Sequence, residues 1–92
     1  MNRQELEKDL IALGVKPGNY TLNGPPYHDS SWVLESVYDR KKAVEIWSVF
    51  NFERGKRYDE EVFITEDEAC KYIYKKLKTH QELVIKFKVK DW

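Results

Sequence analysis

The residue types that nucleophilic catalysis needs stand together at one place in this sequence, residues 28–31, which read His-Asp-Ser-Ser. A histidine backed by a carboxylate can activate a serine hydroxyl, but the three side chains must converge on one point. Residues 23–31 also contain a glycine and two prolines, the composition of a loop. Adjacent residues of a loop rarely converge in this way, so the cluster is better interpreted as a solvated turn than as a catalytic site.

Other enzyme motifs are missing from the sequence, which contains no phosphate-binding glycine loop, no His-Glu-x-x-His and no Gly-x-Ser-x-Gly. Cys70 is the only cysteine, which excludes an intramolecular disulfide and a metal site built from several cysteines. Its spacing to Ile73 and Leu77 is that of a small residue on the apolar face of a helix. We expect a protein that is not an enzyme and needs neither a cofactor nor a metal.

The single cysteine also favours a reducing compartment. Residues 1–9 carry charges where a signal peptide would be apolar, and no apolar run approaches the roughly 18 residues that span a bilayer. We therefore expect a cytoplasmic protein with no membrane partner.

Charge is unevenly distributed along a chain whose 16 basic and 16 acidic residues cancel. The neutral total argues against a general nucleic-acid or membrane-surface binder. Residues 46–70, however, carry seven acidic and three basic side chains, a net charge of −4. Six of these carboxylates form an acidic run with no basic residue among them: Asp59, Glu60, Glu61, Glu66, Asp67 and Glu68.

Two interpretations of the acidic run are open. It can be a solvated strand followed by a helix start, where carboxylates favour the helix dipole. It can also be a surface that steers a basic partner, because a strand end next to a first helical turn would bring the two triplets together as one negative surface. Aromatic side chains on the sheet would then anchor the partner. The partner-binding residues expected on this basis are Asp59, Glu60, Glu61, Glu66, Asp67, Tyr58, Trp47 and Tyr38.

Periodicity and turn residues predict the elements that must position these side chains. Apolar residues recur at helical spacing over residues 3–13 and 65–79, with Asn2 and Thr65 as N-caps and Gly14 as a C-cap. Strands are predicted over residues 18–22, 32–38, 43–52 and 58–64, and alternating lysines predict a last strand over residues 85–89.

Ninety-two residues can bury one core, so we expect a single domain over residues 1–92. The order of elements predicts an α+β fold, in which an antiparallel sheet of about four strands carries an N-terminal helix and a second helix packed on one face. Residues 43–52 have large apolar side chains on both strand faces. The face without helices therefore needs a cover, which is either the loop at residues 23–31 or the C-terminal tail, or else a docked partner.

Residues 71–92 carry the opposite charge, with seven basic and two acidic side chains. Lysines interleaved with Tyr72, Tyr74 and Phe87 could bind RNA or single-stranded DNA. The segment lacks arginines and the two aromatic-bearing strands of the usual RNA-binding sheet. A small nucleic-acid-binding module is therefore the alternative interpretation.

Three segments, residues 47–57 (WSVFNFERGKR), Phe63 and residues 66–72 (EDEACKY), resemble small bacterial immunity proteins. Such proteins are the cognate inhibitors encoded with polymorphic or contact-dependent growth inhibition toxins. Residues 18–22 and 32–35 extend the resemblance, which covers about residues 18–77. It implies a cytoplasmic, non-catalytic protein that binds one toxin domain and blocks its active site or a surface that it needs. The expected toxin is a basic nuclease domain, which the acidic run would complement.

Overall fold

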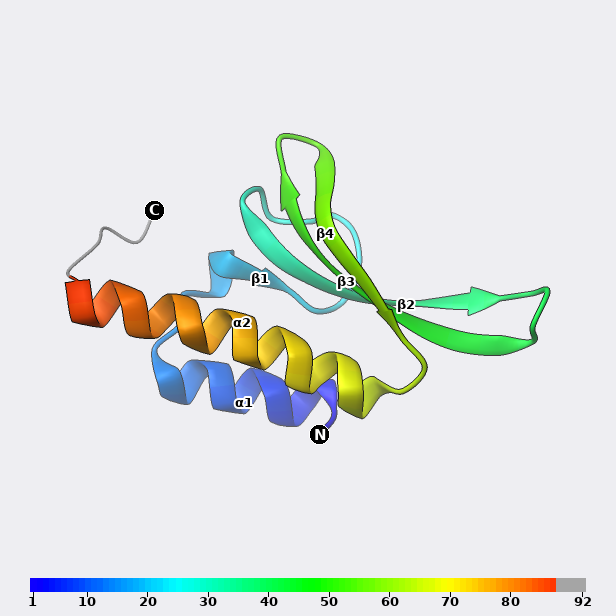
Figure 1. Cartoon of the computed structure of the whole chain (residues 1–92), viewed down its shortest axis with the longest axis horizontal. Coiled ribbons are helices and arrows are strands. Elements are labelled where there is room, and N and C mark those ends of the chain that lie inside the picture. Colours follow the sequence, from blue (N-terminus) through cyan, green and yellow to red (C-terminus); the bar gives the residue numbers. More distant parts are fainter. Residues whose placement is uncertain (88–92) are drawn as a thin grey trace.

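The computed structural model describes residues 1–87 and has two helices on one face of a four-stranded sheet (Figure 1). The elements in chain order are α1 (Arg3–Leu13), the 3₁₀ turn η1 (Pro17–Asn19), β1 (Tyr20–Thr21), β2 (Ser31–Asp39), β3 (Val44–Glu53), β4 (Lys56–Phe63) and α2 (Glu66–Phe87). The strands lie in the order β1-β2-β3-β4. The α+β class and the placement of both helices are as predicted.

Local signals fix both ends of α1 and the start of α2. The side chain of Asn2 accepts a hydrogen bond from the Glu5 N–H at 2.9 Å, and Gly14 closes the helix in the left-handed conformation with φ of 81°. At the start of α2 the hydroxyl of Thr65 accepts from the Glu68 N–H at 3.2 Å, while the Glu68 carboxylate accepts from that hydroxyl at 3.1 Å. The predicted caps of both helices are therefore confirmed.

The sheet is mixed, which corrects the prediction of an antiparallel sheet. β2 pairs antiparallel with β3, and β3 with β4, but β1 runs parallel to β2, with Tyr20 beside Trp32 and Thr21 beside Val33. A parallel pair needs a crossover in place of a tight turn. Residues 22–30 provide it by carrying the chain back to the end of the sheet where β1 began.

The C-terminal strand predicted over residues 85–89 is wrong for residues 85–87, which are the last residues of α2. Helix α2 does not end near Thr79, because the residues that follow, His-Gln-Glu-Leu-Val, include neither a glycine nor a proline to stop it. The Thr79 hydroxyl donates to the Lys75 carbonyl at 2.9 Å, as a residue inside a helix does. Residues 88 and 89 lie outside the described part of the chain.

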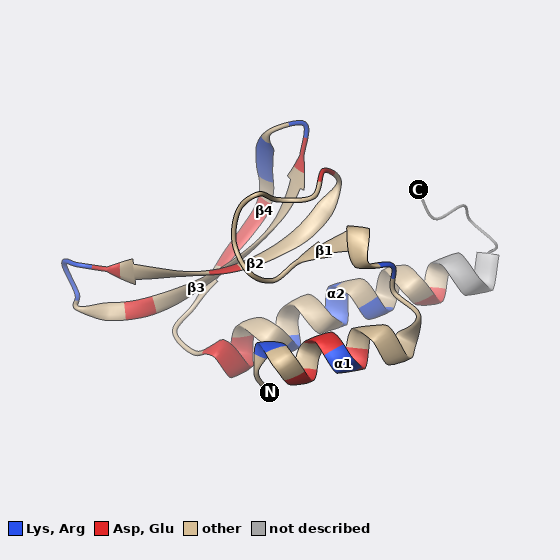
Figure 2. Cartoon of the chain, turned by 180° about the vertical axis from the view of Figure 1, so that it is seen from behind, with Lys and Arg blue, Asp and Glu red and all other residues tan. Residues whose placement is uncertain are grey.

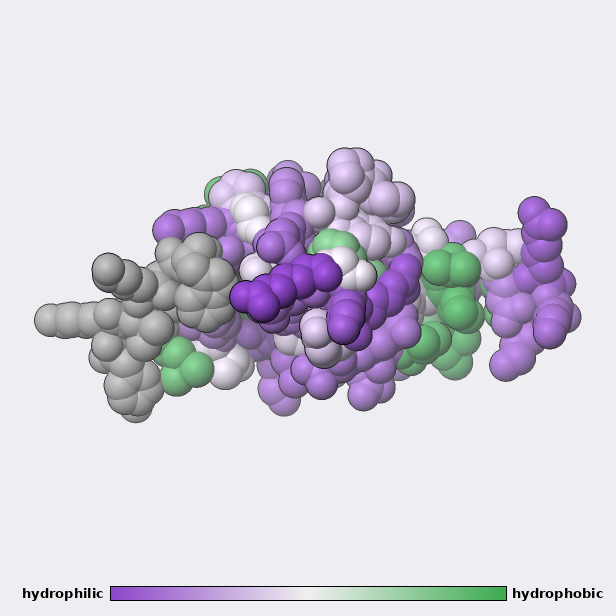
Figure 3. Space-filling model, turned by 90° about the horizontal axis from the view of Figure 1, so that it is seen from above, coloured by the Kyte–Doolittle hydropathy of each residue, from purple (hydrophilic) through white to green (hydrophobic). Residues whose placement is uncertain are grey.

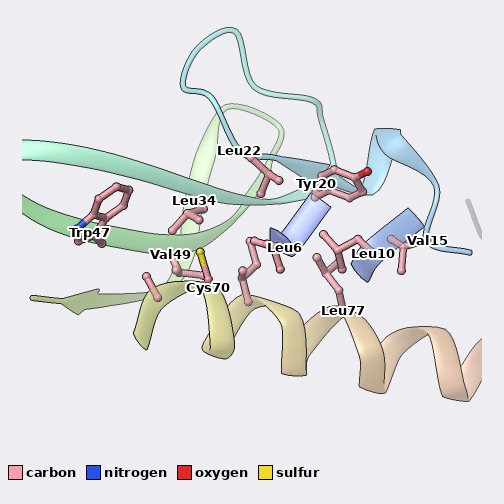
Figure 4. Close-up of a cluster of buried hydrophobic side chains, with 12 residues drawn as sticks. Leu6, Leu10, Val15, Tyr20, Leu22, Leu34, Trp47, Val49, Cys70 and Leu77 are labelled. Carbon is pink, nitrogen blue, oxygen red and sulfur yellow. The ribbon is translucent and has the colours of Figure 1, made fainter. Parts of the chain in front are cut away.

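The main core lies between the helices and the sheet face turned toward them, here called the inner face (Figure 4). Its buried members from the helices and the inner face are Leu6, Leu10, Leu34, Trp47, Val49, Ala69, Cys70, Ile73 and Leu77. Tyr20 of β1 and Leu22, which follows β1, close the cluster beside α1. The opposite, outer face carries Val33 and Phe50, which are also fully buried.

Candidate functional site

The hydroxyl and carboxylate groups of residues 28–31 hold the loop in place. The Ser31 hydroxyl donates to the main-chain carbonyl of His28 at 2.6 Å, and the His28 N–H donates to the Thr21 hydroxyl at 3.0 Å. The Asp29 carboxylate accepts from the Arg54 N–H at 2.7 Å. These bonds tie the loop to β1 and to the turn between β3 and β4, and they direct the hydroxyl and the carboxylate to main-chain groups instead of the imidazole.

Cys70 is a core residue with 0% exposure. Burial, followed by the negative charge of Glu66, raises the pKa of its thiol to about 11. A thiol with this pKa is protonated near neutral pH, and the thiolate is the nucleophilic form. The structure therefore agrees with the interpretation of Cys70 as a small core residue.

The acidic run does not form one surface. Its second triplet, residues 66–68, makes hydrogen bonds and ion pairs with other residues of the domain. The Glu66 carboxylate accepts from the main-chain N–H of Arg3 at 3.1 Å and from its guanidinium at 3.3 Å. Hydrogen bonds from the α-amino group of Met1 and from Lys71 lower the pKa of Asp67. Glu66 and Asp67 thus join the start of α1 to the start of α2.

The first triplet of the acidic run, residues 59–61, is divided between the two faces of the sheet. Asp59 has a φ of 53° and lies in an irregularity of the ladder, where Asn51 pairs with Tyr58 but Val49 pairs with Glu61. This β-bulge leaves Glu61 on the inner face, beside Val49, and Glu60 on the outer face, where it accepts from the Ser48 hydroxyl at 2.6 Å. Figure 2 colours red the acidic residues along β4 and at the start of α2.

The three predicted aromatic anchors also lie apart. Trp47 is 7% exposed and belongs to the core, with the Arg3 guanidinium 5.3 Å from its ring centroid. Tyr38 and Tyr58 are exposed, but they pair with Glu45 and Asn51 at opposite ends of β3. Six residues of strand separate their partners, which is about 20 Å. The structure does not gather the predicted site residues into one patch.

The loop at residues 22–30 covers one half of the outer face. The Tyr27 ring packs edge-on against Phe50 and Phe52, with centroid distances of 5.6 and 5.1 Å. Its hydroxyl donates to Glu35, and burial followed by this hydrogen bond raises the pKa of Tyr27. The Arg57 guanidinium lies 4.2 Å from the Phe50 ring centroid and pairs with Glu35 and Glu60. The sequence left the loop, the C-terminal tail and a docked partner open as covers, and the structure shows the loop over this half.

The other half of the outer face has no such cover within the described residues. There the β2–β3 hairpin projects beyond the helices (Figure 1), and Val37 lies opposite Ile46 with Val44 and Val62 beside them. Val37 is 44% exposed, Val44 40% and Val62 57%. These four residues, Val37, Val44, Ile46 and Val62, are called the hairpin patch below. Figure 3 shows apolar side chains on the hairpin next to its hydrophilic tip.

Both signs of charge border the hairpin patch. Arg40, Lys41 and Lys42 form the tip of the hairpin (Figure 2), while Asp39 and Glu60 lie on the outer face beside the valines. Such a contiguous apolar surface with a polar rim is typical of a protein-binding site. The alternation of residues 43–52 in the sequence predicts that Val44 and Ile46 share a face of the strand. The sequence does not indicate which half of the outer face the loop at residues 22–30 covers.

The structure weakens the nucleic-acid alternative. That alternative relied on a C-terminal strand with lysines on one side, and residues 85–87 of the predicted strand are helical. Lys71 pairs with Asp67 at 2.9 Å, and the Lys76 amino group lies 5.3 Å from the Tyr72 ring centroid. Two of the cations are therefore engaged within the helix.

A cavity of about 80 Å³ lies between α2 and the inner face, lined by residues that include Trp32, Asn51 and His80. It is far below the roughly 300 Å³ at which pockets for organic ligands begin. Among the described residues no group of three His, Cys, Asp or Glu side chains could hold a metal ion. Over the same part of the chain no helix has the length and apolar character to cross a membrane.

Comparison of the chain with protein-family models, with curated proteins and with solved structures finds no match.

Proposed function

We propose that this protein is an immunity protein that binds a cognate bacterial toxin domain and neutralises it by occlusion. The observation that carries the proposal is the hairpin patch, an apolar surface that the chain's own loop leaves uncovered while it covers the other half of the same face. A domain of this size exposes such a patch at a stability and solubility cost, which a partner surface would offset. The resemblance of residues 18–77 to small immunity proteins supports this class of partner.

The patch and its rim suggest a division of roles in binding. Val37, Val44 and Val62 would form the desolvated centre of the interface, where most binding energy arises. Glu60 lies on the same face and would speed the encounter with a basic toxin, because rim charges act mainly on association. We propose a nuclease domain as the toxin and the cytoplasm as the place of inhibition. No catalytic step is required of this chain.

The test of the proposed function is co-expression with the toxin domain encoded beside it. We expect cells that make the toxin to survive only when this protein is also made, and the two chains to co-purify in a fixed ratio. Neither survival nor co-purification would reject the proposal. A mobility shift of RNA at low salt, without toxin binding, would instead support the nucleic-acid alternative.

The location of the site is tested by paired variants. Val62→Asp places a charge in the hairpin patch, and Ile11→Asp places the same charge on α1, where Ile11 is 60% exposed and far from the hairpin. We expect Val62→Asp to weaken toxin binding at least tenfold and Ile11→Asp to leave the affinity unchanged. Both side chains are exposed, so both variants should fold. Equal effects of the two variants would place the interface elsewhere.

A further inference from the structure

The β2–β3 hairpin ends in three consecutive basic residues, Arg40, Lys41 and Lys42, here called the hairpin tip (Figure 2). All three residues are exposed. The ion pairs formed within residues 1–87 include none of them. Adjacent like charges repel one another, so an anionic site on a partner would relieve this repulsion on binding.

The hairpin tip is narrow, and the main chain fixes its shape. The Asp39 carboxylate accepts hydrogen bonds from the main-chain N–H groups of Lys41 and Lys42 at 3.0 and 3.3 Å, which leaves both ammonium groups available to a partner. Strand β4 pairs with β3 only between Trp47 and Glu53, so the sheet continues to the tip as two strands (Figure 1). Neighbouring strands lie about 4.8 Å apart, so this ribbon could enter a groove with little ordering on binding.

Carboxylates lie directly behind the hairpin tip on both faces of the ribbon. Asp39 precedes Arg40 and lies on the outer face, while Glu45 lies opposite Tyr38 on the inner face. Glu60 is further back on the outer face. A nucleic acid fits this arrangement poorly, because the phosphates next to one bound at the tip would face these carboxylates.

The order of charged and apolar residues also disfavours a membrane as the partner. A segment that inserts into a membrane has its apolar side chains deepest and its cations behind them, at the level of the lipid headgroups. In this hairpin the cations come first, and the exposed valines Val37 and Val44 lie behind them. The order fits a protein with an acidic recess, in which the tip lies deepest and the valines contact the surrounding surface.

We infer that the hairpin tip enters the active site of the toxin and takes the place of a divalent metal ion. This inference rests on the proposed function, in which the toxin is a nuclease. A metal-dependent nuclease holds its metal ions with carboxylates, and the surface around them is basic because it binds phosphates. The basic tip would meet those carboxylates, while Asp39, Glu45 and Glu60 would meet the basic surface around them. A nuclease whose catalytic groups are histidines and lysines would repel the tip, so the toxin should be metal-dependent.

Competition with Mg²⁺ tests this mechanism on the wild-type protein. The affinity for the toxin domain encoded beside it is measured without divalent ions and with Mg²⁺ at about ten times the toxin's own dissociation constant for the ion. The dissociation constant of the complex should rise about tenfold, because metal and tip cannot occupy the same carboxylates. Sodium chloride at equal ionic strength is the control, and it should have a much smaller effect.

Paired variants assign the competition to the hairpin tip. Lys41→Gln combined with Lys42→Gln should weaken metal-free binding at least tenfold and remove the sensitivity to Mg²⁺, whereas Lys41→Arg combined with Lys42→Arg should retain both. The matched control is Lys75→Gln combined with Lys78→Gln, which removes the same charge from two exposed residues of α2 and should change neither quantity. The turn should form in every tip variant, because Asp39 bonds to main-chain groups.

The outcomes separate this inference from the proposed function. The absence of both a complex and protection would reject the proposed function and the inference with it. A tight complex that responds neither to Mg²⁺ nor to the glutamine pair at the tip would overturn the inference alone. The glutamine pair may also be assayed with single-stranded RNA and with vesicles containing phosphatidylserine. If it abolishes binding to either of these but not to the toxin, the tip belongs to that ligand and the inference is overturned.

Discussion

The loop that covers half of the outer face should depend on one side chain, Tyr27. Replacing it with phenylalanine removes the hydrogen bond that its hydroxyl donates to Glu35 but keeps the ring contacts with Phe50 and Phe52. A hydrogen bond to a charged group contributes about 1.5 to 3 kcal/mol, and less at a half-buried site, so Tyr27→Phe should lower the free energy of unfolding by about 1 to 2 kcal/mol. Tyr27→Ala also loses two edge-on ring pairs, each about 0.5 to 1.5 kcal/mol, and uncovers both phenylalanines. Its total cost should be about 3 to 5 kcal/mol.

Urea denaturation of the wild-type protein and the two variants measures these differences. The Tyr27→Phe difference should also depend on pH. The pKa of Tyr27 is raised in the folded protein, so its contribution is complete below the ordinary value of 10.0 and is lost as the pH rises through the raised value. The difference from Tyr27→Phe should therefore shrink above pH 10. A cost below about 1 kcal/mol for Tyr27→Ala, or equal costs for the two variants, would refute the assignment of Tyr27 as the clamp of this loop.

Three further predictions follow from single residues. Between pH 9 and 11 the folded thiol of Cys70 keeps its proton while the unfolded one loses it, so this residue should lower the free energy of unfolding by about 1 kcal/mol per pH unit over that range; Cys70→Ala should remove this contribution in denaturation curves. Gly14→Ala should cost about 1 to 2 kcal/mol, since φ is 81° there, whereas Gly18→Ala, with open space and no left-handed backbone, should cost little in the same assay. In stopped-flow association with the toxin domain, Glu60→Gln on the face of the hairpin patch should lower the rate more than Glu61→Gln on the inner face, and an equal loss would contradict the facial assignment.

The parts of the fold that were predictable from sequence are those decided by neighbouring residues. The caps at Asn2, Gly14 and Thr65 each rest on contacts within four residues, and all three are confirmed. The alternation over residues 85–89 predicts a strand, but residues 85–87 continue α2 because no glycine or proline follows Thr79 to end the helix. The parallel direction of β1 depends on the path of the loop that follows it, which no local pattern specifies.

The candidate site was less predictable, because it depends on which faces the elements cover. Regular alternation would put Tyr58 on one face with Glu60, but the bulge at Asp59 puts Tyr58 and Glu60 on opposite faces. The roles of Glu66 and Asp67 depend on Arg3 and Met1, more than 60 residues away in the chain. The sequence indicated that the second face needed a cover, and only the structure divides that face into a covered half and the hairpin patch.

Amide hydrogen exchange of the protein, free and bound to the toxin domain encoded beside it, tests the central claim most directly. If the hairpin patch is the binding surface, the toxin should slow exchange in the segments around Val44 and Val62 and leave α1 unchanged. Slower exchange confined to α1 and α2, with unchanged exchange in β3 and β4, would contradict the claim that the uncovered half of the outer face binds the partner.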